Sequence, residues 1–328
     1  MNDHPPPAPL PDPETLLALQ ERFEAARAAC PELAGAEVNE VLRVVPGKRA
    51  IMAGTLDGRG AVFRMFEPNQ GDMTTREWRE MTRIWPFMNS GAYRVPEPLL
   101  HVPEHGLLVI EHVSGQPLLE HFWQSAPETR DHHLRPAAEW LRHYTEGSES
   151  WRAGNAAGWL ARTERAAATQ PFASLRKIET GILDELRRMA ATLATQEWRV
   201  AICHGDFHPN NLISNEDRLT GIDIGGSARM PVCKDIARFL VHMGRRGMIP
   251  SGARRLGVDQ QGLAAFAEAF ALTSVERGLW LPFFIGCEAL IRVESKSLKK
   301  GRITRAEEMY AVLRDDLIAA RHAGFNAP

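Results

Sequence analysis

The 328-residue sequence has few cysteines, no long apolar run and no excess of charge of either sign. Its cysteines are far apart in the sequence and form no Cys-x-x-Cys pair; they are Cys30, Cys203, Cys233 and Cys287. This spacing favours reduced thiols over a disulfide framework or a zinc site. No uninterrupted apolar run is long enough to cross a bilayer, so we expect no membrane-spanning segment.

The charge balance also excludes classes of protein. The chain has 39 basic and 41 acidic residues, which gives a formal net charge of −2. Such a balance argues against a dedicated nucleic-acid binder. Residues 1–13 are rich in proline and lack the basic and apolar regions of a secretory signal. We therefore expect a mobile N-terminal tail and a cytoplasmic protein.

Two common nucleotide-binding motifs are missing. No Gly-x-Gly-x-x-Gly follows a strand-like segment, which leaves a Rossmann dinucleotide site without support. Gly47-Lys48 is not part of a P-loop, because Leu42 stands where that motif requires glycine and Arg49 replaces the required Ser or Thr. A nucleotide site in this chain must therefore be built in another way.

The first third of the chain reads as a small mixed lobe. A helix begins near Pro13-Glu14, and short β-rich runs follow at 38–45, 50–56 and 61–66, separated by turn signals. The segment 73–88 predicts a helix capped at Thr74 or Thr75, and 98–102 and 106–113 predict two more strands. The pattern becomes helical after Ser114-Gly115, except for β-like pieces within about 200–227. We predict an α+β fold with a tail at 1–13, a β-rich lobe at 14–113 and a larger helical lobe at 114–328.

The chemistry-bearing residues gather between positions 201 and 226. Asp206 lies within the segment HGDFHPNN, Asn211 follows five positions later, and Asp223 ends a strand-like run before two glycines. Carboxylate and amide oxygens suit Mg²⁺, and a carboxylate can orient a hydroxyl and receive its proton. The glycines would let the backbone approach phosphates closely. This set is what phosphoryl transfer from ATP requires.

The motif H-G-D-x-H-x-x-N followed by I-D-x-G resembles the catalytic and metal-binding loops of aminoglycoside phosphotransferases and choline kinases. The resemblance implies a protein-kinase-like bilobal fold and transfer of the ATP γ-phosphoryl group to a hydroxyl of a small molecule. It implies that Asp206 is the catalytic base and that Asn211 and Asp223 bind Mg²⁺. It also implies that His204, and Asp235 in the segment CKDIARFL, support these loops.

The same resemblance extends to the first lobe. Arg64 stands where the family has a phosphate-binding Lys, and strand alternation puts it on the face opposite Phe63 and Met65. An acid on the following helix would hold this cation; Glu77 matches the family position better than Glu80. The turn containing Lys48 and Arg49 corresponds to the phosphate-covering loop, and backbone groups from Glu111 to Val113 correspond to the adenine-binding hinge.

Several alternatives remain at this stage. HGDFHPNN could be only a polar turn, and Arg64 could lie on a solvated strand face. Asp206-x-His208 also opens the metal site of two-metal phosphoesterases, although the further ligands of that class are missing. Because Arg replaces the family Lys, a pseudokinase that binds nucleotide without efficient chemistry is the alternative function.

The acceptor is not fixed by the sequence, because two features indicate opposite charges. Aromatic and acidic residues of the segment 279–295 could surround a cation or could form a core helix; they are Trp280, Phe283, Phe284, Glu288 and Glu294. The basic run 295–305 could meet an acidic acceptor or could be a solvated face.

Overall fold

The computed structural model describes residues 12–70 and 72–322. By backbone proximity the chain divides into two compact units. Unit 1 comprises residues 1–116 and 213–227, and unit 2 comprises 117–212 and 228–328. Of the predicted mobile tail, all but Asp12 and Pro13 lies outside the described residues. Those two residues begin helix α1, where the Asp12 side chain accepts a hydrogen bond from the Thr15 amide.

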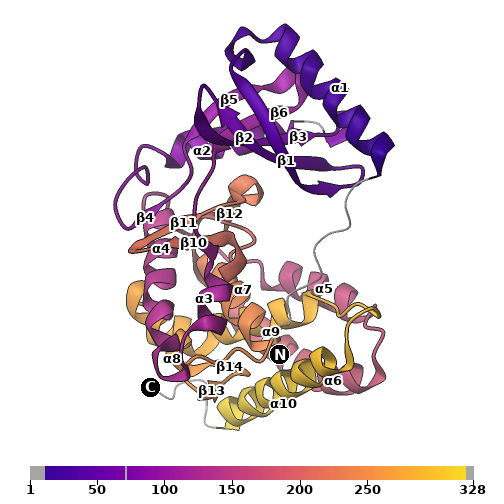
Figure 1. Ribbon diagram of the computed structural model, residues 1–328. Helices are drawn as coiled ribbons and strands as arrows, with labels where there is room; N and C mark the ends of the chain where they lie inside the picture. The colour runs from indigo at the N-terminus through magenta and orange to yellow at the C-terminus, as the bar shows by residue number, and fades with distance from the viewer. Residues whose placement is uncertain (1–11, 71, 323–328) are drawn as a thin grey trace. The chain divides into compact units, whose positions relative to one another are not determined.

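Unit 1 is built on an antiparallel five-stranded sheet (Figure 1). Its strands run in the order β1-β2-β3-β6-β5, and these are β1 (Ala36–Val45), β2 (Arg49–Leu56), β3 (Arg59–Phe66), β5 (Pro98–Val102) and β6 (Leu107–Glu111). Tight turns at 46–48 and 57–58 join the first three strands, as the turn residues of the sequence predict. All five predicted strands of this region are confirmed.

Two helices of unit 1 contact the sheet. Phe63 and Met65 of β3 are buried against Leu19 and Phe23 of α1 (Pro13–Ala29). The neighbouring Arg64 faces the other way, toward α2 (Met73–Ile84), as strand alternation predicts. The prediction that Thr74 or Thr75 caps α2 was wrong. Asp72 precedes the first helical residue, so both threonines lie inside the first turn and Thr74 is buried.

The segment 213–227 returns to unit 1, although the sequence places it within the second lobe. The reason is backbone pairing. Strand β11 (Arg218–Gly221) pairs in parallel with β4 (Tyr93–Arg94), and β10 (Leu212–Asn215) lies between β11 and the short β7 (Gln116–Pro117). Main-chain hydrogen bonds between distant segments therefore carry Asp223 into unit 1.

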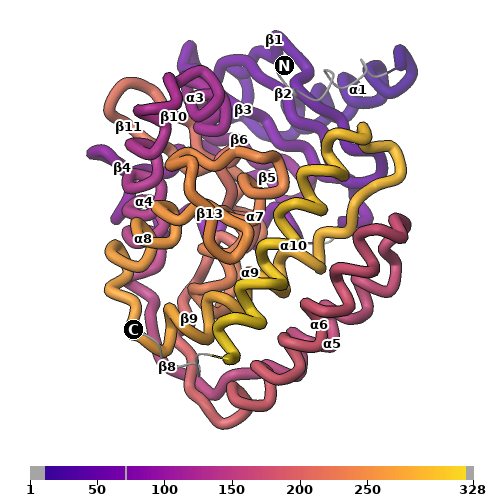
Figure 2. The backbone as a smooth tube through the Cα atoms, turned by 90° about the horizontal axis from the view of Figure 1, so that it is seen from below, coloured from indigo at the N-terminus to yellow at the C-terminus, as the bar shows by residue number. Residues whose placement is uncertain are grey.

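Unit 2 is mainly helical, as predicted from its periodicity. Its helices are α3 (Leu118–Gln124), α4 (Leu134–Glu146), α5 (Ala156–Ala167), α6 (Ala173–Leu193), α7 (Val232–Gly244), α8 (Gln260–Ala269), α9 (Leu281–Ile291) and α10 (Lys300–His322). Figure 2 shows α5, α6 and α10 lying side by side. Helices α7 and α9 are buried almost throughout. Helix α9 is apolar except for Glu288, whereas α7 also buries the polar residues Lys234, Asp235, Arg238 and His242.

Short strands complete unit 2. Strands β8 (Ser150–Ala153), β9 (Glu197–Cys203) and β12 (Ala228–Pro231) form a small antiparallel sheet, and β13 (Arg254–Arg255) pairs with β14 (Val258–Asp259). The end of β9 leads directly into His204 and Asp206. Within the described residues no helix is both long and apolar enough to span a membrane.

Candidate active site

The predicted site residues of unit 1 meet in a buried ion-pair network. Arg64 is 4% exposed, and its guanidinium donates to the carboxylate of Glu77, which is 1% exposed. A second nitrogen of Arg64 donates to Asp223 Oδ1 at 2.7 Å. Burial by itself lowers the pKa of Arg64, but the charges of Glu77 and Asp223 outweigh it, so the pKa is raised. Arg64 is therefore a permanent buried cation, which removes the solvated-face alternative.

The loop after β11 holds Asp223 in an unusual backbone conformation. Asp223 has φ 62° and ψ 42°, a left-handed conformation that Asp tolerates better than most residues. Two residues later, a Cβ on Gly225 would lie 2.7 Å from Glu77 Oε2. The sequence predicted that glycines after Asp223 let the backbone approach phosphates. Gly225 is also required because this loop approaches Glu77 so closely.

The β1–β2 turn contributes Arg49 rather than Lys48 to this network. Lys48 is exposed at the turn, and its role in nucleotide binding stays a prediction. Arg49 lies in β2 next to the turn, and its guanidinium is 3.4 Å from both carboxylate oxygens of Asp223. Two guanidinium groups thus hold Asp223, a geometry that also suits phosphate oxygens.

In the predicted hinge, the backbone shows which group is available. The Glu111 amide donates to Glu97 O at 2.9 Å, and the His112 amide donates to Gly60 O at 3.0 Å. The Glu111 carboxylate accepts hydrogen bonds from Arg94 and from the Glu97 amide, so this side chain is already engaged within unit 1. Among the described residues, no hydrogen bond uses the Val113 amide. Of the three hinge amides, only that of Val113 is left for a nucleotide base.

In unit 2, the loop that begins at His204 is fixed by buried contacts. The His204 ring is fully buried and packs against Trp140, Tyr144 and Phe207. Gly205 has φ 87°, which L-residues rarely adopt, and its amide donates to Asp235 Oδ2 at 3.0 Å. These contacts agree with the supporting roles predicted for His204 and Asp235, which stay predictions.

Lys234 reinforces the same loop and has no counterpart in the sequence prediction. Its ammonium group donates to the Gly205 carbonyl and to Asp235 Oδ1, the latter at 3.1 Å. Lys234 and Asp235 lie in the first turn of α7, so this turn is joined to the loop through the carbonyl and the amide of Gly205. The backbone at Gly205, directly before Asp206, is consequently fixed by two side chains of α7.

The Asp206 carboxylate lies on this loop with two guanidinium groups on one oxygen. Arg238 Nε donates to Oδ1 at 2.8 Å and Arg292 donates to the same oxygen at 3.0 Å. The other oxygen, Oδ2, is 3.5 Å from His208 Nε2. Burial by itself raises the pKa of Asp206, but His208 and Arg238 outweigh it and hold that pKa well below its usual range. Asp206 is thus ionised at neutral pH, and its side chain is 43% exposed.

Asn211 lies on the same loop, and its amide nitrogen donates to the Asp206 carbonyl at 3.0 Å. Because the side-chain nitrogen is used in that bond, the side-chain oxygen of Asn211 is the atom left to bind a ligand. In unit 1, Asp223 offers a carboxylate that is 36% exposed. Carboxylate and amide oxygens are each suitable ligands for Mg²⁺. The metal-binding roles of Asn211 and Asp223 stay predictions.

The two-metal alternative receives no support from the structure. Among the described residues, no group of three or more His, Cys, Asp or Glu side chains is arranged to hold a metal ion. His208 of the Asp-x-His motif stacks on His242 at 4.4 Å between ring centroids instead of joining a set of carboxylates. A two-metal phosphoesterase site needs several such ligands.

The aromatic residues considered for a cation-binding cage belong to the core. Trp280, Phe283 and Phe284 are buried, and the two phenylalanines pack against Trp198. Glu288 and Glu294 are buried as well. Glu294 pairs with Arg245, and Glu288 lies 3.8 Å from Arg292. These acids are compensated by arginines, so this segment forms no cage for a cationic acceptor.

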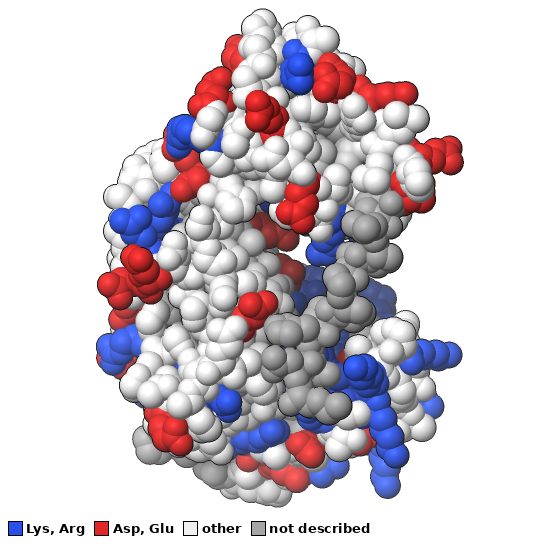
Figure 3. All heavy atoms as spheres, in the orientation of Figure 1, with Lys and Arg blue, Asp and Glu red and all other residues white. Residues whose placement is uncertain are grey.

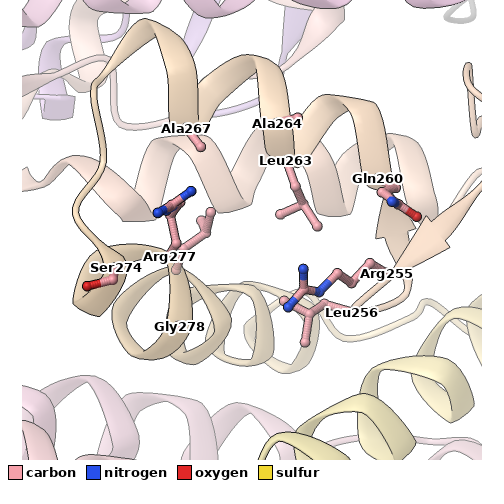
Figure 4. A pocket seen from close by; sticks show the side chains of 10 residues that line it. Arg255, Leu256, Gln260, Leu263, Ala264, Ala267, Ser274, Arg277 and Gly278 are labelled. Atoms are coloured by element: carbon pink, nitrogen blue, oxygen red, sulfur yellow. The ribbon is translucent and has the colours of Figure 1, made fainter. Parts of the chain in front are cut away.

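A separate pocket lies between α8 and the turn that precedes α9 (Figure 4). Arg255 and Arg277 point into it beside Leu263, and the rest of the lining is mostly small or apolar. None of its lining residues belongs to the loops that carry Asp206 or Asp223. This pocket is therefore separate from the predicted site residues of unit 2.

Comparisons with known proteins identify the family of the chain. A model of the phosphotransferase enzyme family matches residues 47–271, which is more than two thirds of the chain and includes both loops. The chain belongs to the phosphotransferase enzyme family. The predicted family and the predicted class of enzyme, a phosphotransferase, are confirmed. No curated protein sequence gives a significant match to this phosphotransferase.

Solved structures confirm the kinase fold. An amicoumacin kinase in complex with AMP-PNP and Ca²⁺ shares 12% sequence identity over 91% of this chain and 96% of its own, with a TM-score of 0.58. A microcompartment-associated aminopropanol kinase shares 15% identity over 91% and 98%, also with a TM-score of 0.58. A choline/ethanolamine kinase family protein from Mesorhizobium loti shares 17% over 93% and 99%, with a TM-score of 0.56. The predicted α+β kinase-like architecture is therefore correct.

Four side chains of this phosphotransferase site were missed by sequence reasoning: Arg238, Arg292, Lys234 and His242. Arg238 and Lys234 had a local signal, because they flank Asp235 on α7 at positions that reach the same loop. Arg292 had none, since 86 positions separate it from Asp206. His242 had none either, because only the fold brings it against His208.

Proposed function

We propose that this phosphotransferase transfers the γ-phosphoryl group of ATP to a hydroxyl of a small molecule, with Asp206 as the base. The observation that carries the proposal is the ionised Asp206 carboxylate, which has one oxygen bound by two guanidiniums and belongs to a side chain that is 43% exposed. The acceptor hydroxyl donates to Oδ2, its oxygen attacks the γ-phosphorus, the bond to the β-phosphate oxygen breaks, and ADP leaves. The hydroxyl proton passes to Asp206.

The depressed pKa of Asp206 fits this role. A weakly basic carboxylate is a poor proton abstractor, but phosphoryl transfer has a loose transition state in which orientation of the nucleophile matters most. The contacts at Oδ1 fix the plane of the carboxylate and so the direction in which Oδ2 faces. Asp206 thus positions the hydroxyl first and takes its proton late.

The remaining predicted residues have matching assignments. Arg64, held by Glu77, would bind the nucleotide phosphates with a permanent charge in place of the usual lysine. The Val113 amide would contact the base. Asn211 and Asp223 would hold Mg²⁺, which when bound neutralises phosphate charge. The names of the structurally similar kinases support a small hydroxyl compound as the acceptor.

The test is the variant Asp206→Asn, which keeps the shape of the side chain and removes its basicity. Acceptor-dependent ADP release should fall about 10²–10⁴-fold in kcat, the usual contribution of a positioned base. Binding of ATP measured by calorimetry should stay unchanged. Asp217→Asn, at an exposed turn, is the matched control and should behave as the wild type.

Two results would contradict the proposal. An unchanged kcat in Asp206→Asn would remove Asp206 from the chemistry. A wild-type protein that binds Mg-ATP tightly, yet releases no ADP with any hydroxyl compound of a broad panel, would establish the pseudokinase alternative instead.

A further inference from the structure

A dense group of cationic side chains surrounds the Asp206 loop within unit 2. It follows one face of α7 and the turn after it, because Arg238, His242 and Arg246 are spaced at i, i+4 and i+8. Arg292 approaches from the end of α9, and Arg302 approaches from α10. We call this set the basic cluster: Arg238, His242, Arg246, Arg292 and Arg302.

The carboxylates nearest to Arg238, Arg245 and Arg292 are already paired, Glu288 among them at 3.8 Å from Arg292. Asp206 is shared by Arg238 and Arg292, while Glu294 is occupied by Arg245. Arg246 forms no ion pair within the described residues; its guanidinium donates to the His242 carbonyl at 2.9 Å. Burial, and then the charges of Arg302, Arg238 and Arg245, lower the pKa of Arg246 to about 9. A cation in such a position is stabilised by an incoming anion.

A second observation indicates that a ligand is expected here. His242 is 4% exposed, yet its Nε2 has no hydrogen-bond partner within the described residues. The same holds for Nδ1 of His208, whose ring stacks on His242. Buried polar atoms of native proteins are usually satisfied, so unpartnered nitrogens next to Arg246, which has no carboxylate partner within the described residues, indicate a missing partner. Phosphate and carboxylate oxygens are suitable partners for both.

The position of the cluster connects it with the acceptor. Contacts run from Asp206 to His208 at 3.5 Å, from His208 to His242 by stacking at 4.4 Å, and from His242 to Arg246 at 2.9 Å. Eight residues of helix rise about 12 Å, which is roughly the span of a phosphorylated sugar or of a longer hydroxy acid. A molecule of that length matches the separation along α7 and the following turn between Arg238, which contacts Asp206, and Arg246.

We propose that the acceptor of this phosphotransferase carries an anionic group, a phosphate or a carboxylate, which binds at Arg246 and His242 while its hydroxyl binds at Asp206. The inference rests on the proposed function for the hydroxyl end only. It also explains the contrast with the amino alcohol named for one structurally similar kinase, because no cage for a cation is formed in the core of this chain. On the face drawn in Figure 3, Lys and Arg side chains are frequent where Figure 1 draws α10.

The first experiment compares acceptors of different charge by ADP release. The panel contains glycerol 3-phosphate and glycerate as anions, glycerol as the neutral parent, and choline and kanamycin as cations. We expect kcat/KM for at least one anion to exceed that of glycerol and of both cations by about tenfold or more, the value of one charge-assisted hydrogen bond. The phosphate and carboxylate arms distinguish the two anions. A cation or glycerol as the best acceptor would overturn the inference.

The second experiment uses the variant Arg246→Gln. The KM for the best anionic acceptor should rise about 10–100-fold, with the effect in KM rather than in kcat. Arg246→Lys, which keeps the charge and loses the planar fork, should lie between this variant and the wild type and serves if the glutamine variant fails to fold. Arg165→Gln, an exposed arginine of α5, is the matched control and should change nothing. An unchanged KM in both Arg246 variants would contradict the inference.

Calorimetry with inorganic phosphate separates this inference from the proposed function. We expect phosphate to bind the wild type and to bind Arg246→Gln about tenfold more weakly or worse. If no compound supports ADP release, the proposed function fails, and this measurement decides the anion site. Weaker binding to the variant supports the site, whereas equal binding, or none to the wild type, overturns it.

Discussion

Each unit of the molecule contains one carboxylate of the predicted site that is held by two guanidinium groups, and the two pairs of arginines differ in how deeply they are buried. Asp223 in unit 1 is held by Arg49 and by Arg64, and Arg64 is itself buried against Glu77. Asp206 in unit 2 is held by Arg238 and by Arg292, of which the Arg292 side chain is 39% exposed. The same chemical motif is therefore anchored in the core in one unit and partly open to solvent in the other.

Because Arg64 is buried and Arg292 is partly exposed, the two arginines have different roles. A buried ion pair cannot lose one partner without leaving the other charge stranded, so Arg64 is part of the structure of unit 1 as well as a candidate phosphate ligand. A partly exposed pair contributes little to stability, so Arg292 can exchange its partner when an acceptor arrives. The following predictions test this contrast, starting with the largest effect.

Replacing Arg64 with methionine should break the buried pair. The change strands the carboxylate of Glu77, and we expect the free energy of unfolding to fall by about 3–5 kcal/mol. Chemical denaturation followed by circular dichroism measures it. Arg59→Met is the matched control on the same strand, because Arg59 is 59% exposed and pairs with Glu97 at 2.6 Å. Its loss should cost about 1 kcal/mol or less. Equal losses in both variants would contradict the contrast.

Introducing a methyl group at Gly225 tests the same network from the loop side. The new Cβ would lie 2.7 Å from Glu77 Oε2, so either the loop or the buried pair must shift. We expect Gly225→Ala to lower the free energy of unfolding by about 1–3 kcal/mol, the range for overpacking. Gly147→Ala is the control, since a Cβ there meets nothing within 4 Å. A Gly225 variant as stable as this control would show that the loop adapts freely.

The smallest effect concerns pH and belongs to unit 2. Burial, followed by the charges of Arg246, His208, Arg238 and Arg245, holds the pKa of His242 well below its ordinary value of 6.5. Below about pH 6.5 the unfolded chain therefore binds a proton that the folded chain refuses, and stability declines as the pH falls. In His242→Phe, the loss of Tm between pH 7 and pH 5 should be smaller than in the wild type. His132→Phe, at an exposed site, should keep the wild-type slope.

The local parts of this architecture could be predicted from the sequence. The strands of unit 1 follow from short β-rich runs bounded by turn residues, and alternation alone put Arg64 on the face opposite Phe63. The choice of Glu77 over Glu80 agrees with the structure, in which Glu77 contacts Arg64 and Glu80 contacts Arg83. Such predictions succeed because neighbours on one strand or one helix turn are fixed by the backbone period.

The rest depends on contacts between distant segments. Residues 213–227 join unit 1 through pairing of β11 with β4, some 125 positions earlier in the chain, which no local pattern announces. Arg292 reaches Asp206 from the end of α9. Arg49 rather than Lys48 contacts Asp223, because Lys48 lies in the turn whereas Arg49 is the first residue of β2. The sequence shows which of these side chains are charged, but it does not show which acidic residue each arginine contacts.

The return of residues 213–227 to unit 1 has a consequence for how this protein can be made and divided. A chain that ends after residue 116 would lack β11 and Asp223, leaving β4 without its parallel partner and Arg64 with one carboxylate instead of two. During synthesis, the nascent first unit must wait for nearly a hundred further residues before its last strands emerge from the ribosome. No single cut in the gene therefore separates the residues of the two units.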